Sequence, residues 1–389
     1  MPGFELIDDQ ERRAVEEVFA RGGILFRMGF DDRRAQVFKV REFELAFAQR
    51  FGAGYAQAVT SGTAALKVAL KAIGIKPGDE VVTQSFTFVA TVEAILECGA
   101  VPVVTEIDRT LNMDPNDLAK KITPRTRAIV PVHMLGAAAR MDEILRIAGN
   151  RGVPVVEDTA QACGGQFRGK PLGTLGAAGT FSFDFGKAMT TGEGGMVATD
   201  QEALFLRARA YSDHGHESNP NFPRGEDTRS MPGFNYRMME LQGAVGLVQL
   251  RKLDEALKQQ RENKARLKDA LRGLRTIRFR EFADEAGETG DTLVFFLENP
   301  KVASRAAQRL FERGIRFKIL PEATQWHFAG TWGHIFSAVK GYRRKDPGKL
   351  WRRSGDLLRS AIAIPIFIKM DEDRIQQTVS AIREVLGRI

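Results

Sequence analysis

Short apolar runs alternate with stretches of helical period between about residues 53 and 200. The runs are rich in β-branched residues and end at turn residues, which is typical of strands in a buried sheet. Strands are expected at 80–83, 101–106, 128–133, 153–158, 179–184 and 195–199. Alternating strands and helices predict an α/β fold with a mostly parallel sheet.

The flanking parts of the chain have helical period. Helices are predicted at 9–21 and 40–51, and leucines repeat at helical spacing through 241–274. A predicted strand at 292–297 and predicted helices at 302–313 and 371–386 then indicate a smaller α+β domain. We therefore divide the chain into two parts. Residues 1–255 form an N-terminal arm and a large domain, and 256–389 a connecting helix and a small C-terminal domain.

Lys187 stands between the predicted strand 179–184 and a turn with three glycines at 192–195. A lysine that is desolvated at a strand end has a lowered pKa, so its free amine can attack a carbonyl and form a Schiff base. This is the chemistry that a pyridoxal phosphate (PLP) enzyme needs. A surface lysine beside a loop is the alternative interpretation.

Three upstream segments fit the other parts of a PLP site. The polar turn 60–66 leads into a helix whose N-terminus favours a phosphate, although Ser61 or Thr63 acting as an ordinary helix cap explains it as well. Asp158 ends a strand, where it can pair with a protonated pyridine nitrogen or cap the next helix. Phe88 follows a strand, where it can stack on a pyridine ring or pack in the core.

Together, the segments SGTAAL, SFTFVAT, EDTAQA and SFDFGK…GEGG resemble the DegT/DnrJ/EryC1/StrS sugar aminotransferase family. The resemblance runs from about residue 3 to the C-terminus and is strongest between 61 and 254. It implies the PLP-dependent transferase fold type I, which is aspartate-aminotransferase-like. In that fold a large domain with a mostly parallel sheet is joined to a smaller α+β domain. It also implies PLP as cofactor and transamination as the reaction.

The resemblance implies roles residue by residue. Lys187 would bind the cofactor aldehyde and move the proton, and Asp158 would pair with the ring nitrogen. Phe88 would stack on the ring, Gln161 would lie near its phenolic oxygen, and Gly62, Thr63 and Ser182 would hold the phosphate. Asn235, in the motif GFNYR, would reach the phosphate of the neighbouring subunit, which implies a homodimer with shared active sites. Arg27, His214 and Arg237 are candidate substrate contacts.

The expected acceptor is a sugar with a keto or aldehyde carbon, and the expected donor pair is L-glutamate and 2-oxoglutarate. The segments MPGFEL, YSDHGH and QWHF…WGHI resemble the branch of the family that acts on an oxidised 3-deoxy-octulosonate (Kdo) in lipopolysaccharide biosynthesis. A nucleotide-linked 3- or 4-keto sugar is the alternative. Retention of Lys187 argues against a PLP-dependent dehydratase, and the set Lys187, Asp158 and Asn235 argues against a non-catalytic regulator.

Composition and charge limit the partners and the cellular location that are expected for this chain. The formal charge is +8, but the basic residues are scattered, so an anionic small molecule explains the charge and no nucleic-acid partner is expected. No apolar run is long enough for a membrane span, and the N-terminus lacks a signal pattern. Cys98 and Cys163 are expected to be reduced and buried, which suits a cytoplasmic protein.

The histidines could belong to a metal site or to the sugar pocket. A metal site at Asp213, His214, His216 and Glu217 is only weakly suggested by close spacing, so no metal is expected. His327 and His334 lie with Trp326 and Trp332 in a segment that is expected either to line the sugar pocket or to pack within the small domain. The roles of His216, His327 and His334 stay open at this point.

Overall fold

The computed structural model describes residues 3–315, 320–339, 341–343 and 345–387. The large part of the chain contains the strands β1 (Tyr55–Val59), β2 (Glu80–Gln84), β3 (Val101–Thr105), β4 (Thr126–Ile129), β5 (Val156–Asp158), β6 (Gln166–Phe167), β7 (Lys170–Pro171), β8 (Ala178–Ser182) and β9 (Gly195–Thr199). Its helices are α1 (Asp9–Ala20), α2 (Lys39–Phe51), α3 (Gly62–Ala72), α4 (Ala90–Glu97), α5 (Pro115–Lys121), α6 (Met141–Gly149) and α7 (Glu202–Tyr211).

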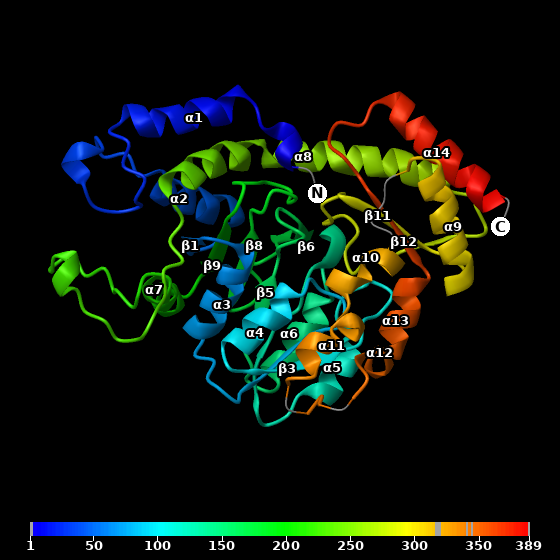
Figure 1. Cartoon of the computed structure of the whole chain (residues 1–389), viewed down its shortest axis with the longest axis horizontal. Coiled ribbons are helices and arrows are strands. Elements are labelled where there is room, and N and C mark those ends of the chain that lie inside the picture. Colours follow the sequence, from blue (N-terminus) through cyan, green and yellow to red (C-terminus); the bar gives the residue numbers. More distant parts are fainter. Residues whose placement is uncertain (1–2, 316–319, 340, 344, 388–389) are drawn as a thin grey trace.

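The C-terminal part begins along the 32-residue helix α8 (Glu240–Leu271). It continues with β10 (Arg278–Phe279), β11 (Thr292–Phe296), α9 (Pro300–Glu312), α10 (Leu320–His327), α11 (Gly333–Phe336), α12 (Pro347–Leu350), α13 (Arg352–Arg359), β12 (Ala361–Pro365) and α14 (Glu372–Gly387). Figure 1 shows α8 running across the top of the molecule and connecting the two halves.

The central sheet is mixed. One part has the order β1-β9-β8-β5 and the other β3-β2-β4. Parallel bridges between Ile129 and Val155, and between Val132 and Asp158, join β4 to β5. The strands therefore follow one another as β3-β2-β4-β5-β8-β9-β1, with β9 antiparallel to both of its neighbours. The predicted α/β class with a mostly parallel sheet is confirmed.

Helices cover both faces of this sheet (Figure 1). Apolar residues of α3 and α7 pack in one cluster with β1, β8 and β9. On the opposite face, Phe43 and Phe47 of α2 pack against Phe181 of β8 and against Phe183, which directly follows this strand and leads to Lys187. Because both faces of β8 are buried, its carboxyl end is held rigidly.

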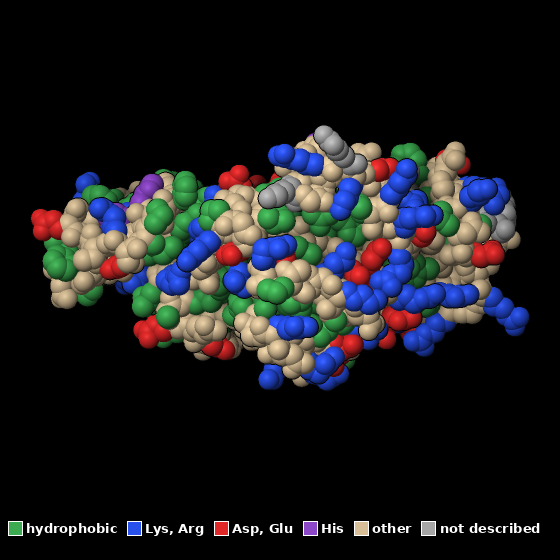
Figure 2. Space-filling view, turned by 90° about the horizontal axis from the view of Figure 1, so that it is seen from below, with side chains coloured by type: hydrophobic (Ala, Val, Ile, Leu, Met, Phe, Trp, Pro, Cys, Tyr) green, Lys and Arg blue, Asp and Glu red, His purple; other side chains and the backbone are tan. Residues whose placement is uncertain are grey.

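The C-terminal part forms its own small core and also packs on the large domain. The antiparallel sheet β10-β11-β12 packs against α9 and α14. The segment α10–α13 packs instead with the large-domain strands: Trp351 Nε1 donates to the carbonyl of Val104 at 3.1 Å, and Ser85 and Ser354 share a hydrogen bond of 2.9 Å. Over the face seen in Figure 2, Lys and Arg side chains are interspersed with Asp and Glu.

Several sequence expectations can be compared with this fold. The helices predicted at 9–21 and 40–51 are present as α1 and α2. The strand predicted at 128–133 ends at Ile129, because Pro131 has no N–H with which to continue the ladder. The chain then turns at Met134–Gly136, where Leu135 has a left-handed backbone (φ 52°). Cys98 and Cys163 are buried thiols. Among the described residues, no helix has the length and apolar character needed to cross a membrane.

Candidate active site

A cavity of about 330 Å³ lies at the carboxyl ends of β5 and β8, beside the N-terminus of α3. Open α/β sheets bind ligands at this edge, because strand ends and helix N-termini converge there. Seven of the residues predicted from the sequence line the cavity: Gly62, Thr63, Phe88, Asp158, Gln161, Ser182 and Lys187.

At one end of the cavity, the backbone at the start of α3 can come close to a bound ligand. Ser61 caps α3, and its Oγ accepts the Ala64 N–H at 3.1 Å, as the ordinary cap interpretation predicts. A Cβ at Gly62 would lie 2.6 Å from Ser182 Cβ, so only glycine fits. The remaining free N–H groups of the first turn of α3 suit the phosphate of PLP.

The other end presents a buried carboxylate. Asp158 is 3% exposed, and its Oδ2 accepts the Thr91 hydroxyl at 2.8 Å while Oδ1 accepts the Ala160 N–H at 3.1 Å. Burial raises the pKa of Asp158, and these two hydrogen bonds oppose the shift. A buried carboxylate with neutral donors is stabilised by a cation, and a protonated pyridine nitrogen supplies one. The residues present therefore fit PLP.

The neighbouring carboxylate, Glu157, has a structural role, because its oxygens are engaged in hydrogen bonds to the surrounding protein. It accepts the N–H groups of Gly173, Leu175 and Gly176 and a hydrogen bond from His133 Nε2 at 3.0 Å. The Ala139 N–H donates to His133 Nδ1, so the proton of this imidazole lies on Nε2. Of the two acids that end β5, Asp158 is thus the one that faces the cavity.

Lys187 lies in the loop after β8 and is half-buried. Its main-chain N–H donates to the carbonyl of Asp184 at 3.0 Å, and its own carbonyl accepts the Gly3 N–H at 2.7 Å. Phe4 stacks on Phe185 with ring centres 4.9 Å apart. The N-terminal segment thus packs directly on the lysine loop, which the sequence patterns did not predict.

Aromatic residues border the cavity mouth. Phe88 is 41% exposed and stacks with Trp326 at 6.5 Å, and its ring lies 5.4 Å from that of His327. His327 lines the cavity, whereas Trp332 is buried in the core and His334 is exposed. Thr91 belongs to the site but was not assigned to it from the sequence, because its only signal is a threonine in a helix. His327 lies in the segment for which lining the sugar pocket was one of two expectations.

Four predicted site residues lie outside the cavity of their own chain. Arg27 pairs with Glu44 at 2.7 Å, and Arg237 pairs with Asp213 at 2.5 Å. Asn235 and His214 are exposed.

Asp213 and His216, for which the sequence weakly suggested a metal site, bind other side chains instead. Asp213 binds Arg224 and Arg237, and His216 lies 3.2 Å from Asp227. Among the described residues, no group of three or more His, Cys, Asp or Glu side chains is arranged to hold a metal ion.

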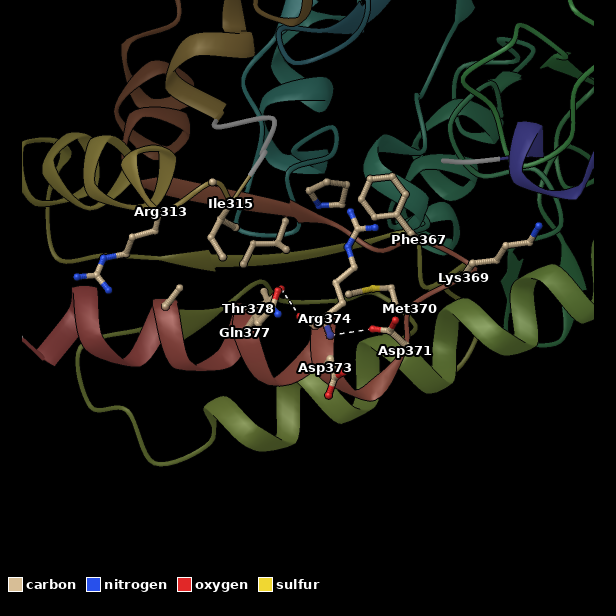
Figure 3. A pocket seen from close by; sticks show the side chains of 14 residues that line it. Arg313, Ile315, Phe367, Lys369, Met370, Asp371, Asp373, Arg374, Gln377 and Thr378 are labelled. Atoms are coloured by element: carbon tan, nitrogen blue, oxygen red, sulfur yellow. Dashed lines mark hydrogen bonds between the residues drawn. The ribbon is translucent and has the colours of Figure 1, made fainter.

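A larger cavity, of about 870 Å³, lies in the C-terminal part, beside β12 and α14. Figure 3 shows Arg374 rising from α14 beside Phe367, with Arg313 and Lys369 at opposite ends. None of the predicted site residues lines this cavity. The Lys187 cavity is therefore the one with the expected chemistry.

Comparison with known proteins agrees with this geometry. Residues 33–383 match the DegT/DnrJ/EryC1/StrS aminotransferase family. The chain is 34% identical over 358 residues to the spore coat polysaccharide biosynthesis protein SpsC of Bacillus subtilis (strain 168), covering 90% of each chain. It is 45% identical over 219 residues to GDP-perosamine synthase of Caulobacter vibrioides, covering 56% of this chain and 57% of that protein.

Among solved structures, an aminotransferase from Psychrobacter cryohalolentis matches with a TM-score of 0.87 and 27% identity over 98% of each chain. The predicted fold type I is confirmed. This chain belongs to the DegT/DnrJ/EryC1/StrS family and is a PLP-dependent sugar aminotransferase.

Proposed function

We propose that this enzyme transfers the amino group of L-glutamate to a keto or aldehyde carbon of an acidic sugar, an oxidised 3-deoxy-octulosonate (Kdo). The observation that carries the transamination chemistry is that Lys187 and the buried Asp158 line one cavity, which also has a glycine-lined cradle at Gly62 and Ser182.

Asp158 and Lys187 have different roles in the proposed reaction. PLP supplies an aldehyde that combines with amines and a ring that accepts electrons. Asp158 holds a proton on the ring nitrogen, because a buried carboxylate stabilises an adjacent cation. Lys187 Nζ anchors the cofactor between turnovers. With PLP bound, the same Nζ, when free as an amine, would take the proton from the substrate carbon and return it on the cofactor side.

The charge around the GFNYR motif supports an anionic acceptor. Arg224 and Arg237 both bind the carboxylate of Asp213, and the carboxylate of Asp227 also attracts Arg224. The Arg224 side chain is 37% exposed, and both guanidinium groups lie over the ring of Phe26. A bidentate arginine is well suited to the carboxylate of a sugar acid.

A nucleotide-linked 4-keto sugar is the second candidate acceptor. It is favoured by the 45% identity to a GDP-perosamine synthase over more than half of the chain. The phosphates of a nucleotide would use the same positive charge as the carboxylate of a sugar acid.

We also propose that two chains share their active sites. Asn235 is exposed and lies outside the cavity of its own chain, so a second copy has access to it. Exposed apolar side chains near the lysine loop and the GFNYR motif, including Phe185, Phe234 and Met239, are available to be covered by that copy.

An acceptor comparison tests the substrate. The PLP-loaded enzyme is given glutamate and either oxidised Kdo or a GDP-linked 4-keto sugar, and the amino sugar and 2-oxoglutarate are quantified by mass spectrometry. We expect amination of the octulosonate. Amination of the nucleotide sugar alone would overturn the acidic-sugar assignment but leave the aminotransferase assignment intact.

The arginines provide the matched variants. Losing one partner of a buried charged hydrogen bond costs about 2–5 kcal/mol, so Arg237→Met should lower kcat/KM for the acidic sugar by roughly 30-fold or more. Arg27→Met is the comparison variant, because Arg27 is the other candidate. If the glutamate half-reaction falls equally, the arginine binds the donor or both substrates. If neither variant discriminates acidic from neutral keto sugars, the acidic-sugar assignment loses its physical support.

A further inference from the structure

Gln161 lines the cavity and is only 4% exposed. The N–H of Leu135 donates to its side chain at 3.2 Å, so the atom that faces Leu135 must be the carbonyl oxygen Oε1. The amide hydrogens on Nε2 are then left for another acceptor, and none of the described residues provides one. Gln161 is thus oriented as a hydrogen-bond donor on the cavity side.

The turn that sets this orientation has an uncommon backbone. Leu135 has φ 52° and ψ 47°, a left-handed conformation that residues with a side chain rarely adopt. The next N–H, of Gly136, donates to the main-chain oxygen of Gln161 at 3.0 Å. Such a conformation persists only where its surroundings determine it, so the groups that hold this turn also hold Gln161.

One buried guanidinium holds the carbonyl side of the turn. Arg280, which is 4% exposed, donates from Nη2 to the carbonyl of Met134 at 2.8 Å and from Nη1 to that of Leu135 at 3.2 Å. Its Nε donates to the carbonyl of Thr110 at 2.7 Å. Burial lowers the pKa of Arg280 to about 10, which still leaves the group charged at neutral pH.

Two further contacts complete the support. The N–H of Thr289 donates to the carbonyl of Gly136 at 2.9 Å, and the side chain of Asn112 accepts the N–H of Met134 at 2.9 Å. Arg280 and Thr289 both come from the C-terminal part of the chain. The turn is therefore clamped between that part and the floor of the cofactor cavity.

We propose that Arg280 is a positioning residue for the cofactor site: through the turn Met134–Gly136 it fixes Gln161 with Nε2 toward the bound cofactor. This inference rests on the proposed role of Gln161 near the phenolic oxygen of PLP. Three carbonyls at fixed positions match the rigid fork of an arginine, and the single ammonium group of a lysine does not span them.

The test follows the bound cofactor and needs no turnover. A donor to the phenolic oxygen stabilises that oxygen as an anion, so losing the donor makes the adjacent lysine–cofactor nitrogen hold its proton to higher pH. We expect Arg280→Lys to move the pH midpoint of the visible absorbance change upward by about one unit, the size expected when a hydrogen bond to a charged group is lost. Gln161→Ala should shift it in the same direction.

The double variant distinguishes positioning from general destabilisation. If Arg280 acts through Gln161, adding Arg280→Lys to Gln161→Ala should cause no further shift. Additive shifts, or an unchanged midpoint in Arg280→Lys, would overturn the proposal. Arg278→Lys is the matched control, because Arg278 is an exposed arginine two residues away.

The proposal can still be tested if Arg280→Lys does not fold, and its failure can be distinguished from failure of the proposed function. If Arg280→Lys does not fold, Asn112→Ser removes the other side-chain anchor of the turn and should give the same upward shift; no shift would overturn the proposal. If the unmodified protein shows no visible band with PLP, the proposed function fails together with this inference. A normal band whose midpoint Arg280→Lys leaves unchanged refutes the inference alone.

Discussion

At the scale of single residues, the environment of Asp158 decides what the site can do. The side chain is nearly inaccessible to solvent and its described hydrogen-bond donors are neutral. Its charge therefore depends on Thr91, on the Ala160 N–H, on the nearby Lys187 and on the cation that the cofactor brings. Small changes in these donors should be visible in the pH dependence of the enzyme.

We expect Thr91→Val to raise the pKa of Asp158 further, because the hydroxyl that donates to Oδ2 is lost. A hydrogen bond to a charged group contributes about 1.5–3 kcal/mol, and 1.36 kcal/mol corresponds to one pKa unit. Asp158 acts as a carboxylate, so the acid limb of the kcat/KM profile should move to higher pH by about one unit. Thr199→Val, which removes a hydroxyl bound to Ala177 away from the cavity, is the control. An acid limb that stays in place would contradict the role of Thr91.

Lys187→Ala should lose the visible absorbance of bound PLP and reduce transamination by roughly 10⁴-fold, the upper range for a positioned proton-transfer group. Lys187→Arg should fail as well, because a guanidinium stays protonated. Absorbance spectra and the glutamate half-reaction measure both effects. The exposed Lys170→Ala should behave as the unmodified protein. Substantial activity in Lys187→Ala would refute the assignment.

The site was predictable where chemistry follows local sequence. Lys187, Asp158 and Gly62 stand at strand ends or helix starts, and strand ends of one sheet meet at one edge. The partners of Arg27 and Arg237 were not predictable, because Glu44 and Asp213 reach them through helix packing and loop folding. Local patterns do not specify such contacts.

At the scale of elements, the approach of α2 to α8 depends on small residues. A Cβ at Gly243 would lie 2.6 Å from the main-chain nitrogen of Val40, and a Cβ at Gly246 would lie 2.7 Å from the ring of Phe43. Glycine lowers intrinsic helix stability, so its presence within α8 reflects this close packing. Leucine periodicity predicted the helix but not the contact.

We therefore expect Gly243→Ala to lower the free energy of unfolding by about 1–3 kcal/mol, the usual cost of overpacking, although alanine favours helix. Gly149→Ala, near the end of α6 where a Cβ would meet nothing within 4 Å, is the matched control and should be neutral or slightly stabilising. Denaturant unfolding measures both. Equal stability of the two variants would show that α2 can move away at little cost.

Other elements were outside the reach of sequence patterns. β1 pairs with β9 from Tyr55↔Thr199 to Val59↔Gly195, yet its sequence YAQAV has weak strand character. Its conformation is imposed by the sheet, since tertiary contacts override local propensity. The packing of α10–α13 on the large-domain strands is likewise a long-range arrangement.

At the scale of the whole molecule, shared sites predict complementation. Lys187→Ala and Asn235→Ala chains, mixed under conditions that exchange subunits, should regain roughly a quarter of the unmodified activity. Half of the randomly formed dimers are mixed, and each of these has one site without either substitution. Light scattering checks the assembly, and separately tagged chains confirm exchange. Activity no higher than in either parent, with exchange confirmed, would mean that the sites are not shared.

The N-terminal segment has a practical consequence. Gly3 binds the carbonyl of Lys187, Phe4 stacks on Phe185, and Glu5 accepts the N–H of Lys369 from the C-terminal part. A Cβ at Gly3 would lie 2.8 Å from the Lys187 carbonyl oxygen, so this position has no room for bulk. A purification tag fused ahead of residue 3 would emerge beside the reacting lysine. Protein prepared for kinetics and spectroscopy should therefore carry its tag after α14.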